Sequence, residues 1–208
     1  MSSSLDAQRP AQEIHSNLQK MGQFQLWTTR PGGRNRGIFT GMSFENLSAT
    51  WPDRPLTDPA VTADVVDLMV SHGDRRRGTL TVLICAPDDH YLATVTVELP
   101  ADAIPAEAVP PEAVPADRST HAVGPSPAQL CGTAMHPIIP AVRTAPGTAL
   151  ILTLGRPGPA RLTDLDNQWS QAATTICRAA GIRLLGFYIA TKDGIYSPDI
   201  TNTPAAAA

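Results

Sequence analysis

The sequence predicts an α/β (α+β) fold in which a mixed β-sheet carries helices on its faces. Four apolar runs have the length and the aliphatic, partly β-branched composition of strands, at 80–85, 91–99, 149–154 and 182–190. A further segment, 163–180, has apolar residues at helical spacing. Helical segments placed between strands along one chain are typical of a sheet covered by helices.

Composition and charge restrict the classes of protein to which the chain can belong. Its 208 residues suit one domain with tails and insertions, and a formal net charge of −3 argues against a general nucleic-acid coat protein. No apolar run approaches the roughly 18 residues that span a bilayer, and residues 1–20 lack the apolar core of a signal peptide. Cys85, Cys131 and Cys177 are odd in number and widely spaced, so we expect reduced, buried thiols and a cytoplasmic location.

The composition changes along the chain and predicts one domain with extensions. Residues 1–22 are polar and patternless and are expected to form a disordered arm, as is the tail 199–208. Residues 23–57 form an N-terminal extension with a basic Gly/Arg loop, and 58–198 form the domain. Within it, 100–129 is a proline- and alanine-rich insertion that contains Glu-Ala-Val-Pro twice, which favours an extended, solvated loop over a partner-binding strip.

The first half of the domain predicts a helix followed by a β-hairpin. Asp58 and Pro59 are typical of a capped helix start, and Gly73 is expected to end the helix. The residues expected on its buried face are Val61, Val65, Leu68, Met69 and His72. The strands at 80–85 and 91–99 are expected to pair as a hairpin, because Pro87-Asp88-Asp89 between them is turn-forming.

The second half predicts a short helix, two buried strands and a long helix between them. The short helix is expected within 137–145, and the strand 149–154 runs into the irregular loop 155–161. Thr163 is expected to cap the long helix, which ends at Gly181. Its apolar stripe consists of Leu165, Trp169, Ala172, Ile176 and Ala180. After the strand 182–190, Lys192-Asp-Gly194 is expected to turn the chain into a short strand at 195–197.

Several short stretches, taken in order, resemble a known family. They are the hairpin 80–99, Gly132-Thr133, His136-Pro137, the strand 149–154 with the loop Leu154-Gly-Arg-Pro-Gly158, Thr163-x-x-Asp166, Gly181-Ile-Arg-Leu-Leu185 and Tyr196-Ser197. This order is similar to that of the RadC branch of the JAB (MPN) metallo-hydrolases, in which a Gly-Thr turn ends the hairpin and His-Pro opens a helix. The resemblance implies the JAB, cytidine-deaminase-like three-layer architecture.

The resemblance also implies a metal site, which this chain does not complete. In the family, two loop histidines and the aspartate of the next helix bind zinc, and a glutamate before the hairpin is the general base. These positions fall on Leu154, Arg156 and Asp166, and near Gly78. A catalytic zinc needs three protein ligands and an open position, and a guanidinium does not deprotonate. We therefore expect no catalytic residues, no bound metal and no cofactor.

The residues that remain have two interpretations each. Asp166, three positions after Thr163, is explained by a capping pair at the helix start. Arg156 is expected either to replace the metal by pairing with Asp166 or to stay free for a phosphate or carboxylate. Together with Arg161 and Thr163 it would then form an anion site at a helix start, whereas solvated arginines in a stiff turn are the simpler alternative.

Two arginine clusters are candidates for contact with nucleic-acid phosphates. They are Arg75, Arg76 and Arg77 before the hairpin, and Arg34 and Arg36 in the N-terminal loop. A solvated surface is the simpler explanation of both clusters, because the chain is acidic overall and has few aromatic residues to stack bases.

The function expected from these observations is that of a pseudoenzyme: a RadC-like JAB domain acting as a protein-interaction or scaffold module. The partner is then another protein, with no membrane contact, and the resemblance implies a mobile-element or DNA-maintenance context. The alternatives are an anion- or nucleic-acid-binding protein that uses the arginine-bearing cleft, a JAB-type metal-dependent hydrolase with non-standard ligands, and an enzyme of another type. The histidines show no His-x-His or His-Glu-x-x-His spacing.

Overall fold

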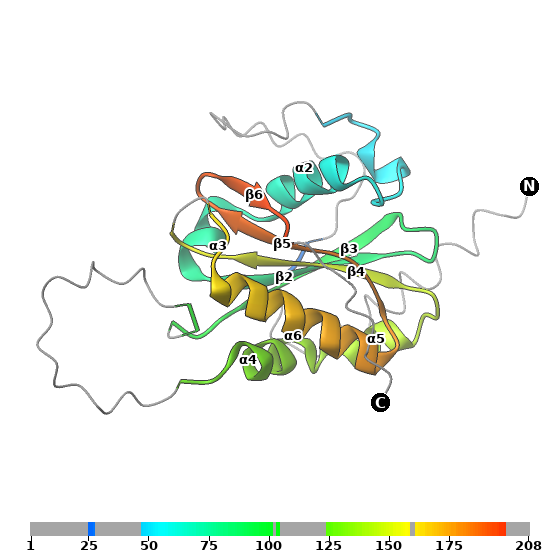
Figure 1. Cartoon of the computed structure of the whole chain (residues 1–208). Coiled ribbons are helices and arrows are strands. Elements are labelled where there is room, and N and C mark those ends of the chain that lie inside the picture. The colour runs from blue at the N-terminus through cyan, green and yellow to red at the C-terminus, as the bar shows by residue number, and fades with distance from the viewer. Residues whose placement is uncertain (1–24, 28–46, 102, 105–123, 159–160, 199–208) are drawn as a thin grey trace, which may run out of the picture.

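The computed structural model places six strands in one sheet with helices on both of its faces (Figure 1). The structure describes residues 25–27, 47–101, 103–104, 124–158 and 161–198. The strands are β1 (Gln25–Trp27), β2 (Thr79–Cys85), β3 (Tyr91–Glu98), β4 (Ala149–Gly155), β5 (Arg183–Thr191) and β6 (Gly194–Tyr196), in the spatial order β1-β3-β2-β4-β5-β6. The predicted fold class, a mixed sheet with helices on its faces, is confirmed.

The pairing of the strands is mixed. Strand β2 lies antiparallel between β3 and β4, β4 runs parallel to β5, and β6 returns antiparallel along β5. The predicted hairpin of β2 and β3 is confirmed, and Asp89 in its turn has a φ of 68°. The parallel pair β4 and β5 is joined by a crossover through the long helix, so the carboxyl ends of both strands lie at one edge of the sheet.

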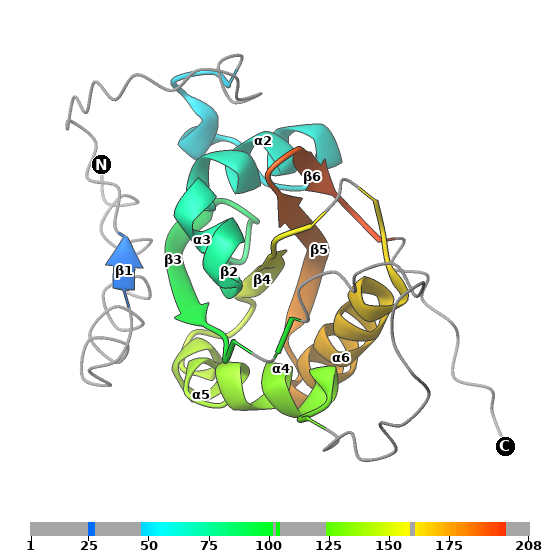
Figure 2. The same ribbon diagram turned by 90° about the vertical axis from the view of Figure 1, so that its left-hand side faces the viewer.

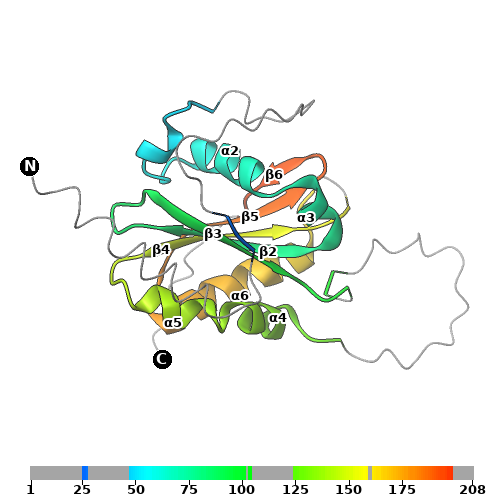
Figure 3. The same cartoon turned by 180° about the vertical axis from the view of Figure 1, so that it is seen from behind.

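The helices divide between the two faces of the sheet. They are η2 (Trp51–Asp53), α2 (Pro59–Met69), α3 (His72–Arg77), α4 (Pro127–Met135), α5 (Ile138–Arg143) and α6 (Asp164–Ala180). Helices α2 and α3 cover one face, and α4, α5 and α6 cover the other, as opposite views show (Figures 1 and 3). Alternation along the strands therefore buries side chains on both sides of the sheet.

Helix α6 follows its sequence pattern closely. Thr163 caps its first turn, Trp169 is fully buried against the sheet, and Gly181 ends it in the left-handed region with a φ of 69°. Leu165 and Ile176 pack half-buried against the same core. The predicted packing of this helix on the sheet is confirmed.

The core on the α2 side extends beyond the expected domain start. Trp51 and Leu56 are 8% and 2% exposed and pack with Val65 and Val66 of α2. The end of the extension 23–57 therefore belongs to the same packed unit as the domain. The N-terminal loop of that extension, the arm 1–22 and the tail 199–208 lie outside the described residues.

The first helix is shorter than expected. Helix α2 ends at Met69, and a new helix, α3, begins after Ser71, which accepts from the backbone of Asp74 in a capping box. Gly73 thus lies inside α3 and does not end α2. Leu68, expected on the buried face, is 40% exposed, whereas the neighbouring Asp67 is buried.

Helix α4 was not expected from the sequence. The insertion was expected to run to 129 and Gly132-Thr133 to form a turn, but both of these residues lie within α4. Ser126 caps this helix, Pro127 opens it and Gln129 completes the capping box. Ser-Pro-x-Gln was therefore the local signal that predicts α4. Most of the insertion, 105–123, lies outside the described residues.

Candidate functional site

Two buried arginine–carboxylate pairs lie at the carboxyl end of β4 and β5. On the α6 side, Arg156 pairs with Asp166, and on the α2 side, Arg75 pairs with Asp67. The backbone N–H of Arg156 donates to the carbonyl of Ala190 at 3.0 Å, and the Arg75 side chain donates to the next carbonyl, that of Thr191, at 2.9 Å. Both pairs are thus attached to the last residues of β5, from opposite faces.

The end of β4 positions Arg156. Leu154 is fully buried and has Leu80 and Ile189 as its partners in the neighbouring strands. Because alternate residues of a strand share a face, Arg156 continues on the side of Leu154, which faces α6. Gly155 between them allows β2 and α3 to approach, since a Cβ there would lie 2.8 Å from Oγ1 of Thr79 and 3.5 Å from the backbone of Asp74.

All three nitrogens of the Arg156 guanidinium donate hydrogen bonds within the chain. Its Nε donates to Oδ1 of Asp166 and its Nη2 to Oδ2, each at 2.7 Å, in a two-pronged pair. Nη2 also donates to the carbonyl of Arg161 at 2.8 Å and Nη1 to that of Pro157 at 3.1 Å. Arg156 is only 4% exposed, so the geometry is that of an internal contact.

Asp166 has both of the roles predicted for it. It is fully buried, and its Oδ2 accepts from the backbone N–H of Thr163 at 2.8 Å, while the Thr163 hydroxyl accepts from the backbone N–H of Asp166 at 3.2 Å. The predicted capping pair is therefore confirmed, and so is the predicted pairing with Arg156. The carboxylate links the loop after β4 to the first turn of α6.

The position that the resemblance assigns to the general base, Gly78, is covered by an apolar side chain. Gly78 follows α3 with a φ of 84°, and a Cβ on it would lie 3.0 Å from Cδ1 of Ile104. Ile104 is 8% exposed and belongs to the core that also contains Leu154. Of the four positions matched to the family's site, the structure brings Arg156 and Asp166 into direct contact and places the other two against apolar side chains.

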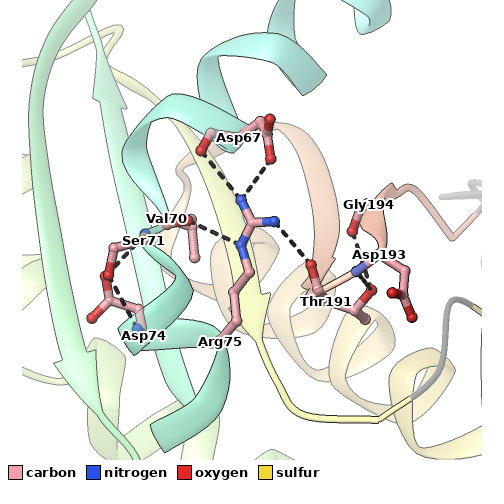
Figure 4. A network of polar contacts seen from close by, with 8 residues as sticks. All are labelled: Asp67, Val70, Ser71, Asp74, Arg75, Thr191, Asp193 and Gly194. Carbon is pink, nitrogen blue, oxygen red and sulfur yellow. Dashed lines mark hydrogen bonds and ion pairs between the residues drawn. The ribbon is translucent and has the colours of Figure 1, made fainter. Parts of the chain in front are cut away.

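Arg75 is a structural residue that the sequence did not predict (Figure 4). It is 2% exposed; its Nη2 donates to Oδ1 of Asp67 at 2.6 Å and its Nε to the carbonyl of Val70 at 3.0 Å. Further bonds reach the carbonyls of Asp67 and Thr191. The expectation that Arg75 contacts nucleic acid is wrong for this conformation, because the α2 end, α3 and β5 enclose its guanidinium.

The remaining candidate arginines differ in their surroundings. Arg76 is exposed, and Arg77 forms an ion pair with Asp74 at 2.7 Å. Arg161 is exposed and accepts the hydrogen bond from Arg156 through its carbonyl. Arg34 and Arg36 lie outside the described residues, so the structure leaves their proposed phosphate contact as a prediction.

The cysteines are poor nucleophiles where they stand. Burial raises the pKa of Cys85 to about 12, with a further contribution from the charge of Asp89. Burial also raises the pKa of Cys131 to about 12 and that of Cys177 to about 11. At neutral pH all three remain thiols, which are weak nucleophiles and weak metal ligands. Among the described residues, no three His, Cys, Asp or Glu side chains are grouped as a metal site would require.

Two surface grooves flank α4, away from the arginine pairs. The first, called here the β3–α4 groove, has a volume of about 460 Å³. Its lining is Val97, Glu98, Leu99, Pro100, Leu130, Thr133, Ala134 and Pro137. The second lies between the start of α4 and α6, with a volume of about 340 Å³ and Gln168, Gln171 and Ile176 in its lining. Neither was expected, because α4 itself was not.

The comparisons with known proteins leave the geometry as the main guide to function. Over the part of the chain that the structure describes, no helix combines the length and apolar character needed to cross a bilayer. The chain matches no protein-family model, no curated protein and no solved structure.

Proposed function

We propose that the chain is a non-catalytic, RadC-like JAB domain that acts as a protein-interaction or scaffold module. The observation that carries the proposal is the buried pair of Arg156 and Asp166. The sequence resemblance assigns these two positions to zinc ligands, and here their side chains bind each other. A permanent cation on Arg156 replaces the charge that a metal would supply next to the carboxylate.

The filling of the other two positions supports the same proposal. A water-activating site needs an open coordination position and a base beside it. Leu154 offers no ligand atom, and Ile104 lies where a side chain at Gly78 would project. A domain whose metal-site positions are filled by other side chains can still bind a partner through its surface. The role that we assign is therefore binding to another protein.

The alternative of an anion site at Arg156 has less support. An incoming phosphate would have to displace Asp166 from a two-pronged contact with both oxygens at 2.7 Å. It would also leave a buried carboxylate without its cation, which typically costs about 3–5 kcal/mol. Arg156 is therefore better explained as a residue that stabilises the loop after β4.

Zinc analysis tests the proposal directly. Protein purified without chelator should hold well under one zinc per chain, and neither EDTA nor added zinc should change the Tm, because metal binding would be coupled to stability. Stoichiometric zinc in the wild type would overturn the proposal.

Restoring the ligands tests the resemblance itself. If residues 154, 156 and 166 occupy the family's metal positions, the variant Leu154→His, Arg156→His should gain zinc at close to one per chain and a zinc-dependent rise in Tm. The matched control adds Asp166→Asn and should lose most of that gain. Failure of the histidine variant to bind zinc, while it remains folded by circular dichroism, would remove the basis for a JAB-derived site.

A further inference from the structure

The β3–α4 groove is an apolar surface beside the edge of the sheet. Its walls are the end of β3 and the face of α4, with Val97 on one side and Leu130 and Ala134 on the other. Glu98 is the only charged residue in its described lining, and its side chain is 69% exposed, at the rim. The groove therefore suits an apolar group that arrives along the sheet edge.

Strand β1 lies beside β3 at the edge of the sheet (Figure 2). Its three residues pair antiparallel with β3, with Gln25 opposite Thr96 and Leu26 opposite Val95. One more pair in the same register would place the preceding residue, Phe24, opposite Val97. Residues directly opposite in an antiparallel pair project on the same face.

The face in question is the one that carries the groove. Val97 packs against the core on the α4 and α6 side and also lines the groove. The sequence Gln23-Phe24-Gln25-Leu26 alternates polar and apolar residues, which is typical of a strand with one apolar face. A strand continued in this register would therefore have its aromatic position opposite the groove-lining Val97.

We propose that Phe24 of the chain itself occupies the β3–α4 groove, as the next residue of the edge strand. A phenyl ring removes a large apolar area from water, and a groove of about 460 Å³ has room for it. Its contacts would be Val97 on β3 and Leu130 and Ala134 on α4. The N-terminal segment would then hold α4 against the sheet and protect the end of β3 from pairing with another chain. This inference is independent of the proposed function.

Methyl NMR on the full chain tests the contact. In the wild type, we expect NOEs between the Phe24 ring and the methyl groups of Leu130 and Ala134. Phe24→Ala should remove them, move these methyl resonances through loss of the ring current, and lower the Tm by about 4–8 °C. Gln23→Ala, on the opposite face of the same strand, is the control and should leave the methyl shifts and the Tm in place.

Two results would overturn the proposal. The first is that the methyl resonances of Leu130 and Ala134 are the same in Phe24→Ala and wild type. That result would mean that the Phe24 ring does not occupy the groove. The other is a set of NOEs seen only between differently labelled chains in a mixed sample, which would assign the groove to a second copy. Retention of the contact in Phe24→Leu with a reduced loss of Tm would support an apolar role.

Discussion

The two buried arginines at the end of β5 are held in different ways. Arg156 makes half of its hydrogen bonds to one carboxylate, through both oxygens of Asp166. Arg75 makes a single bond to a carboxylate oxygen and three to the backbone carbonyls of Asp67, Val70 and Thr191. Arg156 is thus anchored by a two-pronged ion pair, whereas Arg75 donates mainly to backbone carbonyls at the ends of α2 and β5.

This difference teaches what each arginine does for the fold. The last carbonyls of a helix and of a strand lack partners within their own element. Arg75 supplies donors to those at the end of α2 and at the end of β5, where water is excluded. Arg156 bonds to the Asp166 side chain and to the carbonyls of Pro157 and Arg161, and so orders the loop before α6. Substitutions at the two sites should therefore have different energetic consequences.

Removing Arg75 should have the largest effect. Arg75→Ala leaves three buried carbonyls and the Asp67 carboxylate without this donor, so we expect a loss of about 3–5 kcal/mol in the free energy of unfolding. Chemical denaturation measures it, and the exposed neighbour Arg76→Ala is the control that should change little. A loss of less than about 1 kcal/mol would show that water satisfies these carbonyls instead.

The pair on the α6 side should behave as one coupled unit. Arg156→Ala and Asp166→Ala should each cost about 3 kcal/mol, because each leaves the other charge buried and unpaired. The double variant should cost much less than their sum, with a coupling energy of about 2 kcal/mol in a double-mutant cycle. Additive losses would mean that Arg156 acts through its two carbonyl bonds and Asp166 through its capping role alone.

Asparagine substitutions at Asp166 and Asp67 compare how strongly each arginine depends on its carboxylate partner. Asp166→Asn replaces one acceptor of the two-pronged contact with a donor that faces Arg156, so we expect a loss of about 2 kcal/mol. Asp67→Asn can keep an amide oxygen toward Arg75, and we expect about 1 kcal/mol or less. Thermal unfolding of the two variants side by side gives the ranking. Equal losses would contradict the distinction between the two arginines.

Anions should produce the smallest effect. Since Arg156 is engaged internally, sulfate or phosphate should change the wild-type Tm by no more than about 1 °C relative to chloride at equal ionic strength. Arg156→Ala should respond in the same way. Stabilisation of the wild type that is lost in this variant would show that Arg156 is available to a ligand.

The starts of helices α3, α4 and α6 show what local capping signals in the sequence can predict. The Thr163 and Asp166 capping box was predicted because all of its atoms lie within four residues. Ser71 with Asp74, and Ser126 with Gln129, are the same kind of signal. Two competing signals point the other way: a glycine at position 73 favours a helix end, and the proline-rich run continues up to the start of α4. The sequence therefore contains the local information that predicts the starts of α3 and α4.

The sequence by itself determined the strands, the long helix and the cap that presents Asp166, because alternation, helical spacing and capping act between near neighbours. Only the tertiary structure decided that Arg75 is buried. Its acceptor at Thr191 lies 116 residues further along the chain, and no local pattern records such a contact. The burial of a charged side chain depends on which distant carbonyls and carboxylates converge on it, and that convergence exists only once the sheet has formed.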